Sequence, residues 1–174
     1  MAARKILARK KASDLLASAK VKVPPVPVEQ LAKLVGAEIH YEPFPGELSG
    51  MVHRQASGKH LIGVNALHPP TRQRFTVAHE LGHLLLHKDE ALHVDENSPI
   101  AFRNPISSQA TDSDEIEANQ FAAELLMPMY LLKPAFAKIP ADTGTEDAVA
   151  MLAEVFGVSE QAMTFRLSGL KVLG

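Results

Sequence analysis

The sequence predicts an α+β protein that contains a small antiparallel sheet, and two observations lead to this prediction. Apolar residues recur at helical spacing toward both ends of the chain, whereas three short segments between them read as strands. Helices followed by strands and then by more helices are typical of α+β folds. The 174 residues suit one domain, and a hydrophobic content of 46% is enough for a sizeable core.

The first part of the chain predicts two helices joined by an extended connector. Residues 6–20 carry a weak helical pattern of apolar residues. The segment VPPVP (23–27) is extended, because proline blocks both helices and strand pairing. The segment 28–35 then predicts a short helix that ends at Gly36.

Three strands are predicted next. AEIHYE (37–42) alternates apolar and polar residues, as a half-buried strand does. LSGMVHR (48–54) and KHLIGVN (59–65) flank QASG (55–58), which has the composition of a turn. We expect these two strands to form an antiparallel hairpin.

The remaining elements are mainly helical. A long helix is predicted over 69–87, because proline is tolerated at a helix start. Residues 88–113 are polar and irregular, with one short candidate strand at 100–103. A second strong helix is predicted over 112–128, capped by Asp112 and stopped by Pro128. Three shorter helices follow, at about 129–137, 145–156 and 159–170.

From these elements we expect a basic helix at 1–22, a catalytic core at 23–137 and a helical extension at 138–174. The chain has no cysteine, which excludes disulfides, thiolate zinc sites and cysteine nucleophiles. The net charge of −2 and the lack of a long apolar run give no nucleic-acid or membrane signature. We therefore expect a cytoplasmic protein without direct nucleic-acid contacts; its oligomeric state is left open.

The helix at 69–87 contains HELGH (79–83), the pattern of a metallopeptidase. Residues four apart lie nearly above one another on a helix, so His79 and His83 can bind one ion. Glu80 lies roughly 100° around the helix from His79, within reach of a water on that ion. Both histidines lie off the apolar face, so we expect them to face solvent or a cleft rather than the main core.

A zinc site of this kind needs a third protein ligand. His87 lies about 12 Å along the helix from His79, which is too far for a shared ion. Asp89 has the spacing of another peptidase class, but Leu86 stands where that class needs glycine. Glu115 and Glu117 on the second helix remain, with a slight preference for Glu117, because Glu115 can also serve in the helix cap.

Three stretches resemble the ImmA/IrrE family of zinc metallopeptidases: GVN (63–65), HPPTRQRFTVAHELGHLLLH (68–87) and EIEANQFAAELLMP (115–128). The resemblance implies a compact zincin-like domain with zinc, or manganese, held by His79, His83 and Glu117. It also implies that Glu80 is the general base of an endopeptidase. Tyr130, His68 and Arg74 are candidates for stabilising the oxyanion, and Asn119 or Asp114 for orienting a ligand histidine.

The same resemblance implies an endopeptidase of narrow specificity whose substrate is a helix-turn-helix repressor or an antitoxin-like regulator. It also implies a role in transcriptional stress responses. The alternative is a non-catalytic zinc module that docks a DNA-binding partner. The segment GVSEQAMTFRL (157–167) resembles a helix-turn-helix element, but only Arg166 and Lys171 supply positive charge there. We therefore expect it to pack on the core. The hairpin at 48–65 offers a strand edge to an extended substrate or is purely structural.

Overall fold

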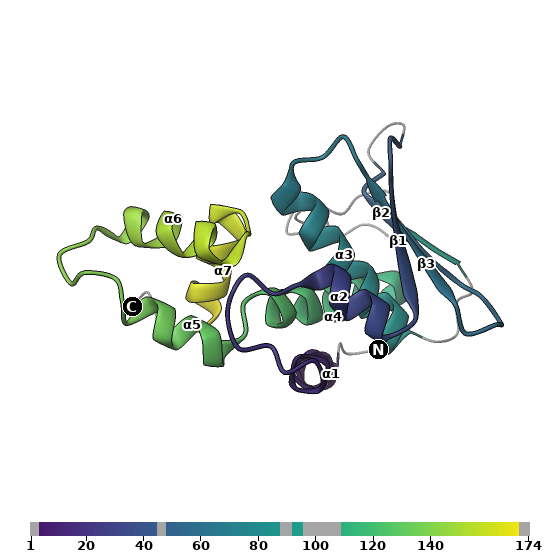
Figure 1. Cartoon of the computed structure of the whole chain (residues 1–174), viewed down its shortest axis with the longest axis horizontal. Helices are drawn as coiled ribbons and strands as arrows, with labels where there is room; N and C mark the ends of the chain where they lie inside the picture. The colour runs from purple at the N-terminus through teal and green to yellow at the C-terminus, as the bar shows by residue number, and fades with distance from the viewer. Residues whose placement is uncertain (1–3, 45–47, 88–91, 96–108, 171–174) are drawn as a thin grey trace.

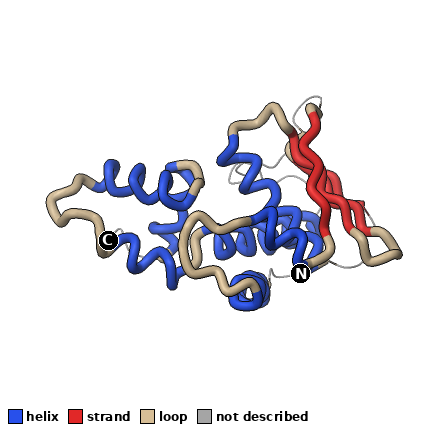
Figure 2. Tube along the Cα trace, in the orientation of Figure 1, coloured by secondary structure: helices blue, strands red, loops and turns tan. Residues whose placement is uncertain are grey.

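The computed structural model describes residues 4–44, 48–87, 92–95 and 109–170 of the chain. Within these residues a sheet stands at one end of the molecule and the last three helices at the other (Figures 1 and 2). The strands are β1 (Ala37–Glu42), β2 (Gly50–Arg54), β3 (His60–Asn65) and β4 (Leu92–Asp95). The helices are α1 (Lys5–Ser18), α2 (Val28–Leu34), α3 (Pro70–Leu86), α4 (Gln109–Leu126), α5 (Met129–Phe136), α6 (Thr145–Phe156) and α7 (Glu160–Gly169). The predicted α+β class is confirmed.

The sheet is mixed, so the expectation of a purely antiparallel sheet is wrong. Its order is β1-β3-β2-β4. The predicted hairpin is confirmed, since β2 pairs antiparallel with β3 and the turn closes with Gly58 at φ 78°. β1 instead runs parallel to β3, with Ala37 opposite His60. Because β1 and β4 lie outermost among the described strands, the hairpin itself presents no free edge.

Two elements of the middle region differ from the sequence predictions. β4 pairs antiparallel with β2, although residues 92–95 lie in a stretch that the sequence predicted as irregular. The candidate strand at 100–103 lies outside the described residues. α4 begins at Gln109 rather than near Asp112, so Asp112 lies within the helix.

One continuous apolar core joins the helices to the sheet. Fully buried side chains in it come from five elements: Leu16, Val52, Leu81, Phe121 and Phe156. α3 packs against both α4 and the sheet, and α1 packs along α4. This arrangement places α3 at the centre of the fold, between the strands and the other helices (Figure 1).

The C-terminal helices contribute buried residues to this core. Ser159 caps α7 by accepting a hydrogen bond from the Ala162 amide at 3.2 Å. Arg166 is buried, and its guanidinium donates to the Met127 carbonyl at 2.9 Å and to the Glu124 carboxylate at 2.6 Å. Arg166 is therefore not available for a phosphate, and Lys171 lies outside the described residues. Within the described parts of the chain, no helix has the length and hydrophobicity that a membrane span requires.

Candidate metal centre

α3 carries His79, Glu80 and His83 into the interior. All three side chains are buried, with exposed fractions of 0%, 0% and 1%. The histidines do not face solvent, because α4 covers them. A Cβ at Gly82 would lie 3.0 Å from the Cα of Ala118, so glycine at this position lets α3 and α4 pack unusually close. The ligand-bearing face of α3 is thus an interface between two helices.

Three side chains with possible donor atoms converge at that interface. The Nε2 atoms of His79 and His83 lie 3.0 Å apart. The two carboxylate oxygens of Glu115 lie 3.2 Å from these nitrogens, one oxygen on each. A tetrahedral zinc ion with ligands at about 2.0–2.1 Å holds its donor atoms roughly 3.3 Å apart. The residues present therefore fit a single zinc ion.

The charge state of Glu115 also suits a metal ligand. Burial raises the pKa of Glu115, but hydrogen bonds and charge from His79 and His83 outweigh it and hold the pKa well below its usual range. The carboxylate is consequently ionised at neutral pH. When a bound zinc ion takes the place of the proton on each ring, this carboxylate and two neutral imidazoles would form a donor set that zinc prefers.

His79 is held in the orientation that such a site needs. Its Nδ1 lies 3.1 Å from the Oδ1 of Asn119 on α4. An amide oxygen only accepts, so Nδ1 carries the proton and Nε2 has the lone pair that can bind an ion. Asn119 is therefore the orienting partner of His79, as the sequence suggested, whereas Asp114 lies 3.4 Å from His87.

Glu117, the third ligand implied by the family resemblance, meets different partners. Its carboxylate accepts from the Arg4 backbone amide at 2.6 Å and from the Arg4 guanidinium at 3.1 and 2.9 Å. His87 Nε2 lies 3.2 Å from the same carboxylate. Burial raises the pKa of Glu117, but these hydrogen bonds outweigh it and lower the pKa to about 2. The structure brings Glu115 to the two histidines and not Glu117, so the expectation for the third ligand is revised to Glu115.

Glu80 lies against β2 at a glycine. A Cβ at Gly50 would lie 3.0 Å from the Glu80 carboxylate and would overlap the methyl group of Thr76. A glycine inside a strand often marks such a close backbone approach. Sequence reasoning missed Gly50, although that signal was present. Sequence reasoning also missed Arg4, for which the sequence carries no signal.

Tyr130 and Arg74, two of the candidates for oxyanion stabilisation, donate hydrogen bonds to backbone carbonyls. Tyr130 donates to the Val21 carbonyl at 2.8 Å. Arg74 donates to the carbonyls of Val26 at 2.8 Å and Gly157 at 3.1 Å. Both side chains therefore hold backbone segments together. His68 precedes α3 and stays a candidate, and Asp89 lies outside the described residues.

Comparisons with known proteins identify the family of the chain. Residues 32–168 match the Peptidase_M78 family, described as the IrrE N-terminal-like domain. The chain is 31% identical over 166 residues to the radiation response metalloprotease IrrE of Deinococcus radiodurans, covering 90% of this chain and 48% of that protein. A solved Mycobacterium tuberculosis transcriptional regulator has a similar fold, with a TM-score of 0.60 and 18% identity over 92% of this chain and 55% of that one. The chain thus spans about half the length of these relatives.

Proposed function

Because the chain belongs to the Peptidase_M78 family of IrrE N-terminal-like domains, we propose that it is a zinc-dependent endopeptidase whose ion is held by His79, His83 and Glu115. The observation that carries this proposal is the convergence of three side chains: the two Nε2 atoms lie 3.0 Å apart, and each lies 3.2 Å from one carboxylate oxygen of Glu115. Manganese is a second candidate metal, because imidazole and carboxylate ligands also suit it.

When bound, the zinc ion supplies Lewis acidity toward a water molecule and a peptide carbonyl. Glu80 is the residue next to the first ligand, so its carboxylate reaches the space beside the ion. There it accepts the proton of the attacking water and later delivers that proton to the leaving amine. Gly50 leaves room for this carboxylate between α3 and β2. Burial of Glu80 excludes bulk water from the proton transfer.

The proposed substrate is a transcriptional repressor of the helix-turn-helix type or an antitoxin-like regulator, cleaved at few sites. Two findings support a regulatory substrate: the relative is named a radiation response metalloprotease, and the fold recurs in a transcriptional regulator. We also expect the protein to act in the cytoplasm and without direct contacts to nucleic acid, since Arg166 is used internally.

The test is the variant Glu80→Gln, examined together with the candidate regulator. We expect cleavage to fall by at least about 100-fold, because a general base contributes 10²–10⁴-fold, while zinc content stays at the wild-type level. Glu154→Gln changes an exposed glutamate on α6 in the same way and serves as the control.

Mass spectrometry of the regulator fragments measures the outcome. Unchanged cleavage by the Glu80→Gln variant would remove Glu80 from the mechanism. A wild-type protein that binds the regulator and zinc but produces no fragments would favour the alternative, a docking module without catalysis.

A further inference from the structure

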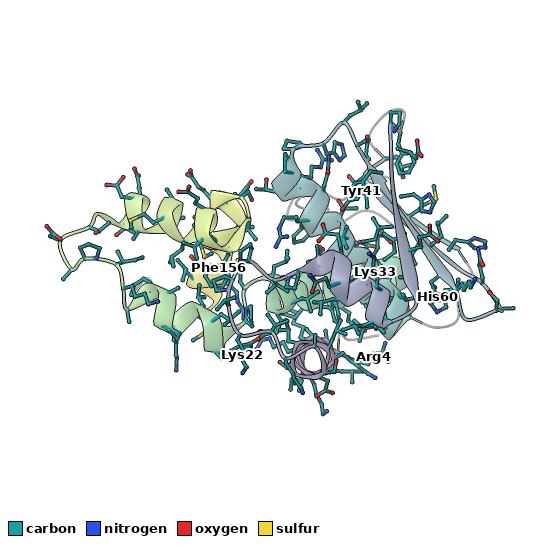
Figure 3. All side chains as sticks on the ribbon, in the orientation of Figure 1. Arg4, Lys22, Lys33, Tyr41, His60 and Phe156 are labelled. Carbon is teal, nitrogen blue, oxygen red and sulfur yellow. The ribbon has the colours of Figure 1, made fainter. Side chains whose placement is uncertain are left out.

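A buried chain of hydrogen-bonding groups leads away from the metal centre toward the N-terminus. His83 Nδ1 lies 3.1 Å from His87 Nδ1, and His87 Nε2 lies 3.2 Å from Glu117 Oε2. Glu117 in turn accepts from Arg4, labelled at the start of α1 in Figure 3. The chain crosses from α3 to α4 and then to α1. His83, His87 and Glu117 have exposed fractions of 1%, 8% and 2%, so water does not substitute for these contacts.

The protons in this chain follow from the first member. If His83 binds the ion through Nε2, that nitrogen carries no proton, and the proton of the neutral ring is on Nδ1. His83 Nδ1 therefore donates to His87 Nδ1, which must be unprotonated to accept. The proton of His87 is then on Nε2, which donates to the Glu117 carboxylate. The tautomer of His83 therefore determines the tautomer of His87.

The last carboxylate has no acceptor position to spare. The Oε1 atom of Glu117 accepts from the Arg4 amide and from Arg4 Nε, and Oε2 accepts from Arg4 Nη2 and His87 Nε2. A carboxylate offers about four lone-pair sites, so these four donors use them all. Glu117 is held in place by a bidentate guanidinium, which is the strongest geometry for such a pair.

The same atoms raise the question of a second ion. His87, Asp114 and Glu117 offer one ligand atom each, and these lie within 4.8 Å of one another. Two observations argue against a second ion there. His87 Nε2 must carry a proton when His83 binds zinc, and the guanidinium of Arg4 already supplies the positive charge beside Glu117.

We propose that His87, Glu117 and Arg4 are positioning residues that act on the metal through His83. They fix the His83 proton on Nδ1, hold the ring so that Nε2 points at the ion, and increase electron donation from Nε2 by partial proton transfer toward Glu117. This inference rests on the proposed metal centre, and it assigns Glu117 a place behind a ligand instead of at the ion.

The first test measures zinc affinity by competition with a chelator. Loss of such a partner typically weakens metal binding 10–100-fold, and we expect His87→Leu to do so. His87→Gln keeps one acceptor and one donor, so it should restore most of the affinity. Arg4→Met should give a smaller loss in the same direction, because Arg4 lies two contacts farther from the ion than His87 does.

A matched control lies on the same helix. Glu124 is also a glutamate of α4 bound by an arginine, at 2.6 Å from Arg166, but it is not linked to a histidine in the chain described here. Glu124→Gln should leave zinc affinity unchanged. Wild-type affinity in the His87→Leu variant, or an equal loss in Glu124→Gln, would overturn the proposal.

The second test uses the unaltered protein, so it does not depend on the folding of a variant. Nitrogen-15 spectra of the zinc-loaded protein should show the His83 proton on Nδ1 and the His87 proton on Nε2, with one zinc per chain. A His87 proton on Nδ1 together with two zinc ions per chain would overturn the proposed role of His87, Glu117 and Arg4 in favour of a second metal site.

These outcomes separate the inference from the proposed function. If the protein shows the expected tautomers and affinities but never cleaves a regulator, the positioning role of His87, Glu117 and Arg4 stands and the proposed peptidase activity is wrong. If the protein cleaves a regulator and binds zinc equally well without His87, the peptidase activity stands and the positioning role is wrong. Wild-type protein that takes up no zinc overturns both.

Discussion

Glu115 and Glu117 are two residues apart on one helix and meet different partners for a simple geometric reason. A step of two residues rotates about 200° around a helix, so the two carboxylates cannot share one neighbour. Glu115 points at α3 and its two histidines, whereas Glu117 reaches Arg4 and the more distant His87. Apolar periodicity locates the buried face of α4, but it does not say which neighbouring helix each flank of that face meets.

Glu115→Gln therefore tests which glutamate is the ligand. Removing one of three protein ligands should weaken zinc binding by more than the 10–100-fold expected for a residue behind the ligands. Glu117→Gln is the matched comparison, because its amide oxygen can still accept a hydrogen bond from His87. Isothermal titration with zinc measures both. A larger loss in Glu117→Gln than in Glu115→Gln would contradict the ligand set.

The two tyrosines allow a prediction about pH. Burial, and then the charge and hydrogen bond of Glu29, raise the pKa of Tyr41 to about 12. Burial also raises the pKa of Tyr130. In a Tyr130→Phe background, the ultraviolet absorbance of tyrosinate should thus rise with a midpoint near 12. Adding Glu29→Gln should lower this midpoint, while Glu154→Gln should not.

The sign of the associated stability change follows from the same shift. A pKa raised in the folded state means that the neutral phenol is favoured by folding. The contribution of Tyr41 is present below about pH 10, the unfolded value, and is lost as the pH rises toward 12. Because Tyr41 is 40% exposed, we expect only a modest effect on unfolding. A midpoint near 10 in the folded protein would contradict this account.

At the scale of elements, the contact between α3 and α4 is the one that assembles the metal centre. Gly82→Ala should disrupt it, because the new Cβ would lie 3.0–3.3 Å from three atoms of Ala118, two of them backbone. Alanine normally favours a helix by about 1 kcal/mol over glycine. Overpacking typically costs about 1–3 kcal/mol, so the net change should be destabilising.

Gly169→Ala is the control for this variant, because nothing lies within 4 Å of a Cβ at that helical position. It should leave the free energy of unfolding unchanged or slightly higher. Urea unfolding measures both variants, and zinc affinity should fall only in Gly82→Ala, since the clash moves the histidines away from Glu115. A Gly82→Ala protein as stable as wild type would contradict the close packing.

Most element boundaries could be predicted because they depend on local residues. Pro69 before α3, Gly36 after α2 and Ser159 before α7 punctuate the chain where the structure begins or ends a helix. Which strands and helices lie next to one another could not be predicted in the same way. The alternation in β1 shows which side chains share a face, but it carries no information on whether β3 runs parallel or antiparallel beside it.

The candidate site shows the same division. His79, Glu80 and His83 follow from one local motif, and a helix brings them together whatever surrounds it. The third donor and the partner of His87 come from α4 and α1, so they depend on tertiary packing. A charged residue near the start of the chain gives no sign that it will reach a carboxylate 113 positions away.

At the scale of the whole molecule, zinc should stabilise the folded chain because its proposed ligands come from two separate helices. An ion that binds only the folded state adds about 2.7 kcal/mol at a concentration 100 times its Kd. Chelation should therefore lower the Tm in differential scanning calorimetry, and readdition of zinc should restore it. The double variant His79→Gln/His83→Gln should show no zinc-dependent shift. An equal shift in that variant would place the ion elsewhere.

The contact between Arg4 and Glu117 has a consequence for biosynthesis. Synthesis releases the amino end of a chain first, so α1 leaves the ribosome long before α4 exists. Until α4 is made, the two imidazoles of α3 lack Glu115, and the guanidinium of Arg4 lacks Glu117. Non-local contacts of this kind slow folding. A newly made chain can thus assemble the proposed three-ligand site only after α4 has been translated.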